Sequence, residues 1–301
     1  MKKNKKPTVR NVAICFSGMA KTLELCYPYI KKNLLDHIGS YDIFCYTEDD
    51  ENIEKIKLLK PIKTKKIKSS EVDKILKTEI KTLKKQNYKT CIYPESFRFN
   101  LRNVYQQLYK INGSFNLLEK HMNENKVSYK YFIRMRFDFL PLDTFKLEDF
   151  KIKKNEVIIP KIKESFIKDE INDMFCVTRD FGTFKSYCSL LNDFEKVVQE
   201  KISIKPTFFQ KMYFFFEKNY SAFFFFLFKK LNKKQRKLPR YFLGLFLLFP
   251  KMFYKKFKEG YRCSLEKVLV YHLKSKNRMI REEVINHVIV RNLRDGLLIF
   301  G

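Results

Sequence analysis

The sequence lacks several features that define common classes of protein. Its 301 residues contain no Trp, and its seven Cys residues form no Cys-x-x-Cys pair. The apolar run Val12–Phe16 is too short for a signal-peptide core, and no run approaches the roughly 18 apolar residues of a membrane-spanning helix. Disulfides, a paired-cysteine zinc site and a spanning helix are therefore not indicated. We expect buried free thiols and a cytoplasmic protein, either soluble or peripheral to a membrane.

Acidic residues are scarce relative to basic ones. Lys and Arg total 62 against 33 Asp and Glu, which gives a formal net charge of +29. Such an excess favours a polyanionic partner, namely nucleic acid, anionic lipid or phosphorylated substrates. A general preference for Lys is an equally good explanation of part of it, since Lys far outnumbers Arg. The 45% hydrophobic content suffices for a buried core, and the length allows one large α/β domain or two small ones.

One stretch, residues 129–141, organises the functional prediction. Tyr131–Met135 predicts a short buried strand that ends in a cluster of charge made by Arg134, Arg136 and Asp138. Ligands of open α/β sheets bind outside the carboxyl ends of the strands. Two guanidiniums and a carboxylate at that place suit an anionic ligand together with a divalent cation. The alternative is a purely structural ion pair between Arg136 and Asp138.

Other predicted strands also end in polar or small residues. Val9–Phe16 predicts a central parallel strand, and Ser17 and Gly18 after it let the backbone approach a ligand closely. Asp173 precedes a strand predicted over Met174–Thr178 and is either a site residue or part of a turn. The other expected elements are strands over residues 41–46, 62–67, 90–93 and 156–160, helices over 70–86, 100–123 and 264–273, a helix after residue 180, and a helix or strand over 284–293.

Two further groups of polar residues have two readings each. The acidic residues 48–50, at the end of the second predicted strand, are either a ribose or base contact or a solvated loop. Gln106 and Gln107, on the helix over residues 100–123, are either site residues or surface residues.

Residues 205–258 differ in composition from the rest. Phe clusters alternate with basic residues there, and no acidic residue occurs from Lys229 to Lys258. This pattern is typical of a segment that lies in a membrane interface, where each Lys or Arg near anionic lipid contributes ~1 kcal/mol. A helical hairpin packed on the core is the alternative. Single-stranded nucleic acid also attracts aromatic and basic side chains.

Several fragments, taken in order, resemble glycosyltransferases of capsule and lipopolysaccharide loci. They are VAICFSGMAKTLE, YDIFCYT, QQLYKINGSFNLLEK, YKYFIRMRFDF, INDMFCVTRDFGTFKSYCSLL and SLEKVLVYHL, and they cover roughly residues 10–50, 98–195 and 262–275. The resemblance implies a GT-A-like (Rossmann-like) α/β fold, with a mostly parallel sheet flanked by helices and a Phe/Lys-rich helical insertion. The sequence departs from the family pattern at Lys21, where Arg is usual, and it has no Asp-x-Asp.

The resemblance also suggests roles for individual residues. The candidates are Ser17, Gly18 and Lys21 for the nucleotide, Arg134 and Arg136 for the donor, Asp138 for a Mn²⁺ or Mg²⁺ ion and for catalysis, Asp173 for the acceptor base or a sugar contact, and His272 for a phosphate or metal site. We expect Arg136 and Asp138 to act as a pair, with Arg134 serving the opposite face of the sheet.

We therefore predict a glycosyltransferase with three segments. Residues 1–200 are expected to bind the nucleotide sugar and catalyse transfer, 201–260 to form a basic, aromatic helical insertion that associates with membrane, and 261–301 to form helices that complete the catalytic domain. The predicted acceptor is a cell-surface polysaccharide or lipid-linked glycan at the anionic inner face of the cytoplasmic membrane. Nucleic acid is not the expected partner. The alternatives are a non-enzymatic nucleic-acid-binding protein and an inactive glycosyltransferase-like scaffold.

Overall fold

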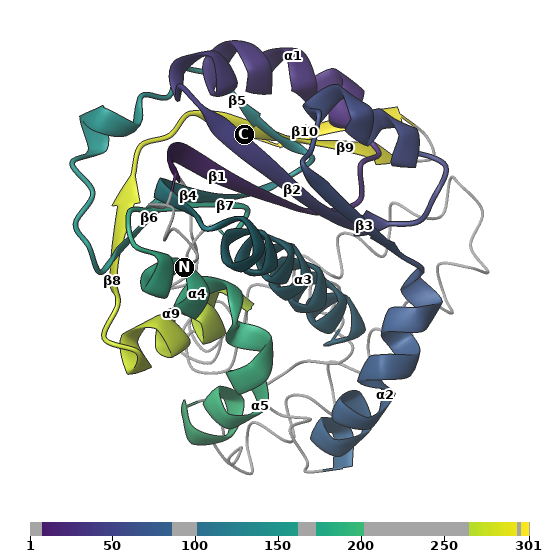
Figure 1. Cartoon of the computed structure of the whole chain (residues 1–301). Helices are drawn as coiled ribbons and strands as arrows, with labels where there is room; N and C mark the ends of the chain where they lie inside the picture. Colours follow the sequence, from purple (N-terminus) through teal and green to yellow (C-terminus); the bar gives the residue numbers. More distant parts are fainter. Residues whose placement is uncertain (1–7, 86–100, 162–172, 202–264, 294–295, 301) are drawn as a thin grey trace, which may run out of the picture.

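The protein folds around a seven-stranded sheet with helices on both faces (Figure 1). The computed structural model describes residues 8–85, 101–161, 173–201, 265–293 and 296–300. The strand order is β3-β2-β1-β4-β7-β6-β8, and β7 alone runs against the other six strands of this sheet. The predicted α/β class, with a mostly parallel sheet flanked by helices, is confirmed.

Four neighbouring strands form the parallel half of the sheet. They are β3 (Lys63–Ile67), β2 (Tyr41–Glu48), β1 (Thr8–Gly18) and β4 (Val127–Arg136). The connecting elements are α1 (Leu23–Asn33), η1 (Leu35–His37), η2 (Ile53–Leu59), α2 (Ser69–Lys85) and α3 (Leu101–Asn125). The strands and helices predicted over this part of the described chain are all present. Helix α1 contains Pro28 without ending there.

Strand β1 is buried on both faces, which explains why its sequence is apolar without alternation. Val12, Ile14 and Phe16 belong to a core cluster shared with α1. Ala13 and Cys15 point the other way, into a cluster shared with α3. Figure 1 shows α1 and α3 on opposite faces of the sheet. The first half of α3 therefore lies beneath the carboxyl ends of the parallel strands, because α3 leads back to the start of β4.

The second half of the sheet is built from shorter strands. These are β6 (Glu156–Pro160), β7 (Phe175–Thr178) and β8 (Met279–Glu283), and they are covered by α4 (Phe181–Cys188), α5 (Leu190–Lys201) and α9 (Leu265–Ser275), with η4 (Leu147–Phe150) ahead of β6. Helix α4 is capped by Asp180, whose carboxylate accepts a 2.7 Å hydrogen bond from the Thr183 amide.

The carboxyl-terminal segment differs from its prediction. Residues 261–301 were expected to form helices, but α9 is followed by β8, β9 (His287–Leu293) and β10 (Gly296–Phe300). Strand β9 pairs with β10 and with β5 (Phe139–Pro141), which follows β4. The helical expectation was wrong because β5, far away in the sequence, supplies the pairing partner that makes β9 a strand.

Several predictions concern residues that lie outside the described ranges. They are the strand over residues 90–93 and the membrane-associating insertion over 201–260 beyond residue 201. Within the described ranges, no helix is long and apolar enough to cross a membrane. The thiol prediction is confirmed for the cysteines in those ranges, which are free and buried: Cys15, Cys26, Cys45, Cys176 and Cys188.

Candidate functional site

The polar residues singled out on different strands meet at one edge of the sheet. Because β1 and β4 are parallel, their carboxyl ends share this edge, and the register pairs Ser17 with Arg136. Because β7 runs the other way, its beginning lies at the same edge, with Asp173 just ahead of it. Ser17, Gly18, Arg136 and Asp173 therefore come together where open α/β sheets bind their ligands.

Gly18 provides an opening at the end of β1. Its φ of +125° is in the region that side chains rarely adopt, and a Cβ built there would meet no atom within 4 Å. The Thr47 hydroxyl, at the end of β2, donates a 3.0 Å hydrogen bond to the Gly18 carbonyl. Lys21 is exposed beyond this turn, and its carbonyl accepts a hydrogen bond from Lys55. The space around the Gly18 Cα is compatible with the predicted close approach of a ligand, which stays a prediction.

Arg136 and Asp138 form a bidentate ion pair. Arg136 Nε lies 2.8 Å from Asp138 Oδ1, and Nη2 lies 2.6 Å from Oδ2. The two side chains are 24% and 14% exposed, respectively, so the pair is partly shielded from solvent. The Val290 amide of β9 donates a 3.0 Å hydrogen bond to the Asp138 carbonyl, which fixes the turn after β4. Arg136 and Asp138 are therefore adjacent, as expected, and the ion pair of the structural alternative is present, whereas their role in a donor site stays a prediction.

The residues around Asp138 do not form a ready site for a divalent cation. Both of its carboxylate oxygens accept hydrogen bonds from Arg136. Among the residues that the structure describes, no three His, Cys, Asp or Glu side chains converge in a way that could hold a metal ion. A cation shared with substrate phosphates needs only one or two carboxylates, but Asp138 would first have to separate from Arg136.

Arg134 is fully buried on the face of the sheet that packs against α3. Its register partners are Cys15 of β1 and Cys176 of β7, and both belong to the core cluster that includes α3. The expectation that Arg134 serves the face opposite to Arg136 was wrong, because residues two apart along a strand share a face. Within the described chain, Nε and Nη1 of Arg134 have no hydrogen-bond partner.

Asp173 is buried and held by two helices. The Gln107 side chain of α3 donates a hydrogen bond to Asp173 Oδ2, and the Tyr187 hydroxyl of α4 donates one of 3.2 Å to the Asp173 carbonyl. Gln107 is thus the glutamine that faces the site. Burial is the main cause that raises the pKa of Tyr187 well above its usual value, and the nearby Asp173 charge adds to it. Tyr187 therefore acts as a neutral donor.

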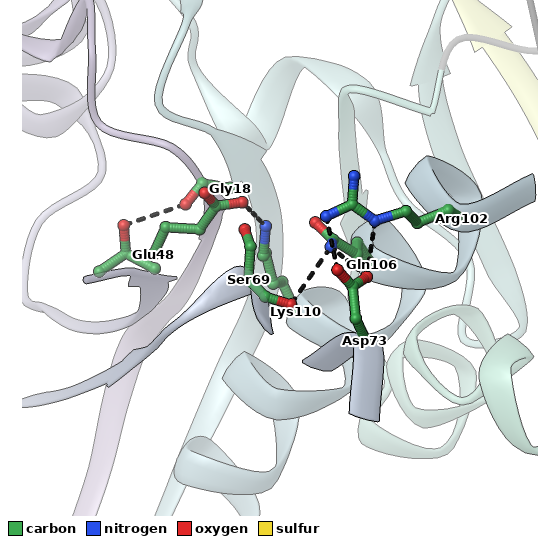
Figure 2. A network of polar contacts seen from close by, with 8 residues as sticks. Gly18, Glu48, Ser69, Asp73, Arg102, Gln106 and Lys110 are labelled. Carbon is green, nitrogen blue, oxygen red and sulfur yellow. Dashed lines mark hydrogen bonds and ion pairs between the residues drawn. The ribbon is translucent and has the colours of Figure 1, made fainter. Parts of the chain in front are cut away.

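A second polar network borders the site below Gly18 (Figure 2). Glu48, at the end of β2, pairs with the buried Lys110 of α3. Beside them, Asp73 of α2 accepts hydrogen bonds from Arg102 and from Gln106, at 2.7 and 2.8 Å respectively. Sequence reasoning missed Lys110, because only the fold brings it beneath the end of β2. The network orders the side of the site formed by α2 and α3.

His272 does not join this group of side chains. It is fully buried on α9, where its Nε2 lies 2.7 Å from the Ser186 carbonyl of α4 and its Nδ1 lies 3.6 Å from Asp193 of α5. These contacts connect three helices. Burial lowers the pKa of His272, so the neutral ring is favoured. The structure thus places His272 among packed helices, while its predicted phosphate or metal role has no supporting contact among the described residues.

Comparison with known proteins gives a family match and a structural similarity. The family described as "Domain of unknown function (DUF7796)" matches residues 7–208. No curated protein matches the sequence. Among solved structures, the apo form of mouse xyloside xylosyltransferase 1 is similar at a TM-score of 0.35 and 7% identity, over 64% of this chain and 76% of that chain. Because the family match extends over more than half of the sequence, this chain belongs to the DUF7796 family.

Proposed function

We propose that this protein is a glycosyltransferase that moves a sugar from a nucleotide-sugar donor to a glycan or lipid-linked acceptor. The observation that supports this most is the meeting of Ser17, Gly18, Arg136 and Asp173 at the carboxyl edge of a mostly parallel sheet. That edge is where nucleotides bind in open α/β folds. An open glycine turn, a guanidinium and a buried carboxylate match the backbone approach, anion stabilisation and base that transfer requires.

In the proposed reaction, the acceptor hydroxyl oxygen bonds to the anomeric carbon of the donor sugar. The bond between that carbon and the donor phosphate oxygen breaks, and the nucleoside diphosphate leaves with the electron pair. Asp173 accepts the hydroxyl proton, with Gln107 and Tyr187 holding it in position. Arg136 lies at the neighbouring strand end, where its positive charge would favour the departing diphosphate once the guanidinium separates from Asp138.

A Mn²⁺ or Mg²⁺ ion remains a prediction of the sequence. When bound, such an ion would neutralise charge on the donor diphosphate. The only carboxylate assigned to it, Asp138, accepts two hydrogen bonds from Arg136. No step of the proposed reaction is therefore routed through a metal, and activity measured with and without Mn²⁺ will decide the question.

Association with the inner face of the cytoplasmic membrane is also part of the proposal. Its support is the sequence of residues 205–258, in which Phe clusters alternate with Lys and Arg. Flotation of the full chain with anionic vesicles tests it, with a variant lacking residues 205–258 as the comparison. Failure of the full chain to float, or equal flotation of the shortened chain, would contradict membrane association by this segment.

The transfer activity itself is tested with a panel of nucleotide sugars. Purified protein is incubated with each donor, with and without Mn²⁺, and released nucleoside diphosphate and glycosylated products are identified by mass spectrometry. We expect one donor to be turned over and Asp173→Asn to abolish turnover while remaining folded. If no donor is consumed and the protein instead binds oligonucleotides with strong salt dependence, the nucleic-acid-binding alternative gains support.

A further inference from the structure

Arg134 is a buried cation with unused hydrogen-bond donors. Its side chain has no exposed surface, and Nε and Nη1 lack a partner in the described structure. Buried charges in proteins are normally paired, because a buried charge without compensation is strongly destabilising. A guanidinium stays protonated in proteins, so Arg134 cannot avoid this penalty by losing its proton. A nearby anion would therefore stabilise the buried Arg134 guanidinium.

The side chains that flank Arg134 do not supply that anion. Cys15 and Cys176 are its register partners on the two neighbouring strands. Burial raises the pKa of the Cys176 thiol to about 12 and also raises that of Cys15, so both stay neutral at physiological pH. Burial likewise raises the pKa of Tyr187, whose hydroxyl is directed at the Asp173 carbonyl. These three described neighbours of the guanidinium are therefore neutral.

Ser17 offers a second unused donor on the same face. It lies two positions after Cys15 on β1, and therefore shares the α3 face with Arg134 on the neighbouring strand. Ser17 is buried, and its hydroxyl has no hydrogen-bond partner in the described chain. The next residue is Gly18, where an added Cβ would meet no atom within 4 Å. Two buried donors without a partner in the described chain therefore lie on one face of neighbouring strands, close to the glycine turn at the edge of the sheet.

We propose that Ser17 and Arg134 form one subsite that binds a phosphate-type oxyanion. Phosphate oxygens accept several hydrogen bonds at once, and the planar guanidinium fork suits them better than an ammonium group does. The subsite differs from the Arg136–Asp138 pair, in which the guanidinium already binds a carboxylate. Its identification with the donor diphosphate rests on the proposed glycosyl transfer, whereas oxyanion binding itself does not.

The competing explanation is an internal partner. The charges of Asp173 and Arg134 both affect the pKa of Tyr187, so both side chains lie near its hydroxyl. A rotation of Asp173 away from Gln107 would make Arg134 a structural member of an ion pair. The two explanations predict opposite effects of replacing Arg134. A buried ion-pair partner stabilises the folded protein. A ligand-binding charge that is unpaired in the free protein destabilises it.

The test measures both stability and binding in the full-length chain. Arg134→Met replaces the buried charge with an apolar side chain of comparable length. Arg10→Met removes a partly exposed arginine that pairs with Asp42 near the start of β1, and it is the control for the loss of one arginine elsewhere in the same sheet. Binding of inorganic phosphate, inorganic pyrophosphate and UDP is measured by calorimetry, and unfolding is followed in urea. We expect Arg134→Met to be as stable as the wild type or more so, and to bind pyrophosphate about tenfold more weakly or worse.

Further arms separate the remaining outcomes. Ser17→Ala should weaken pyrophosphate binding several-fold without loss of stability, and Arg10→Met should leave binding unchanged. Tighter binding of UDP than of either inorganic ion would identify the oxyanion as part of a nucleotide. If Arg134→Met is destabilised or fails to fold, or binds pyrophosphate like the wild type, the subsite is refuted even if sugar transfer is found. If pyrophosphate binding depends on Arg134 but no nucleotide sugar reacts, the subsite stands and the proposed function fails.

Discussion

The Tyr187 hydroxyl donates a 3.2 Å hydrogen bond to the backbone carbonyl of Asp173, which fastens helix α4 to the residue just before β7. Both residues are buried, so water cannot readily replace the bond. On its other side, Asp173 accepts a hydrogen bond from Gln107 of α3. The proposed base is thus positioned by two helices that also form the core beneath the sheet. Substitutions at residues that do not contact a substrate can therefore alter the position of the Asp173 carboxylate.

Tyr187→Phe should reduce both stability and turnover. The variant keeps the ring in the core but leaves the Asp173 carbonyl without this donor, so we expect a loss of about 1 kcal/mol in the free energy of unfolding. Less precise placement of Asp173 should lower kcat more than it changes KM. Urea unfolding and donor turnover measure the two effects. Tyr271→Phe, on α9, is the matched control, and equal behaviour of the two variants would argue against a positioning role.

Gln107→Glu tests Asp173 as a base through the pH dependence of the rate. A second carboxylate beside Asp173 would disfavour its ionisation. The acidic limb of the pH–rate profile should therefore move to higher pH, with the rate at alkaline pH less affected. Gln106→Glu is the control, since Gln106 contacts Asp73 and not Asp173. A profile that stays in place for Gln107→Glu would remove Asp173 from the proton transfer.

The parallel half of the sheet could be predicted because local sequence determines it. Residues 12–16 are apolar without alternation, as a strand covered on both faces requires, and α3 carries a continuous apolar stripe. Strand β9 could not be predicted in the same way, because its pairing partner β5 lies far upstream. A short segment rich in β-branched residues is read as helix or strand until its partner is known.

The sequence predicts only those site residues that lie at the ends of strands. Ser17, Arg136 and Asp173 were found because each follows or precedes an apolar run in the sequence. Lys110 was missed, since its pairing with Glu48 depends on the packing of α3 beneath β2. The lack of a hydrogen-bond partner for Nε and Nη1 of Arg134 in the described chain is likewise a property of the assembled core. A polar residue on a strand does not reveal whether the neighbouring strands will supply it with partners.

His272 should make stability depend on pH. Burial lowers its pKa below the ordinary value of 6.5, although the Ser186 carbonyl and Asp193 favour the charged form, while Lys276 opposes it. Below pH 6.5 the unfolded chain binds a proton that the folded chain resists, so stability is complete above this pH and falls as the pH decreases through it.

Replacement of His272 by Gln measures this contribution. Gln keeps a donor for the Ser186 carbonyl but cannot titrate, so the stability advantage of the wild type should shrink below pH 6.5. Urea unfolding on both sides of that pH provides the comparison. The exposed His37, replaced in the same way, is the control. Parallel stability curves for wild type and His272→Gln would show that the ring titrates alike in both states.

The Arg136–Asp138 pair is either part of the donor site or a structural ion pair, and a double-mutant cycle separates these roles. Arg136→Gln and Asp138→Asn each remove one charge while keeping a polar side chain. Because the pair is partly exposed, we expect the free energy of unfolding to fall by about 1 kcal/mol for each variant, and by little more for both together. For a donor-binding pair, kcat/KM for the nucleotide sugar should also fall by about tenfold or more.

A stability coupling accompanied by wild-type kcat/KM in all three variants would assign the pair to the fold alone. The same measurement with added Mn²⁺ shows whether Asp138 serves a cation, since only a metal-binding role makes the effect of Asp138→Asn depend on the ion.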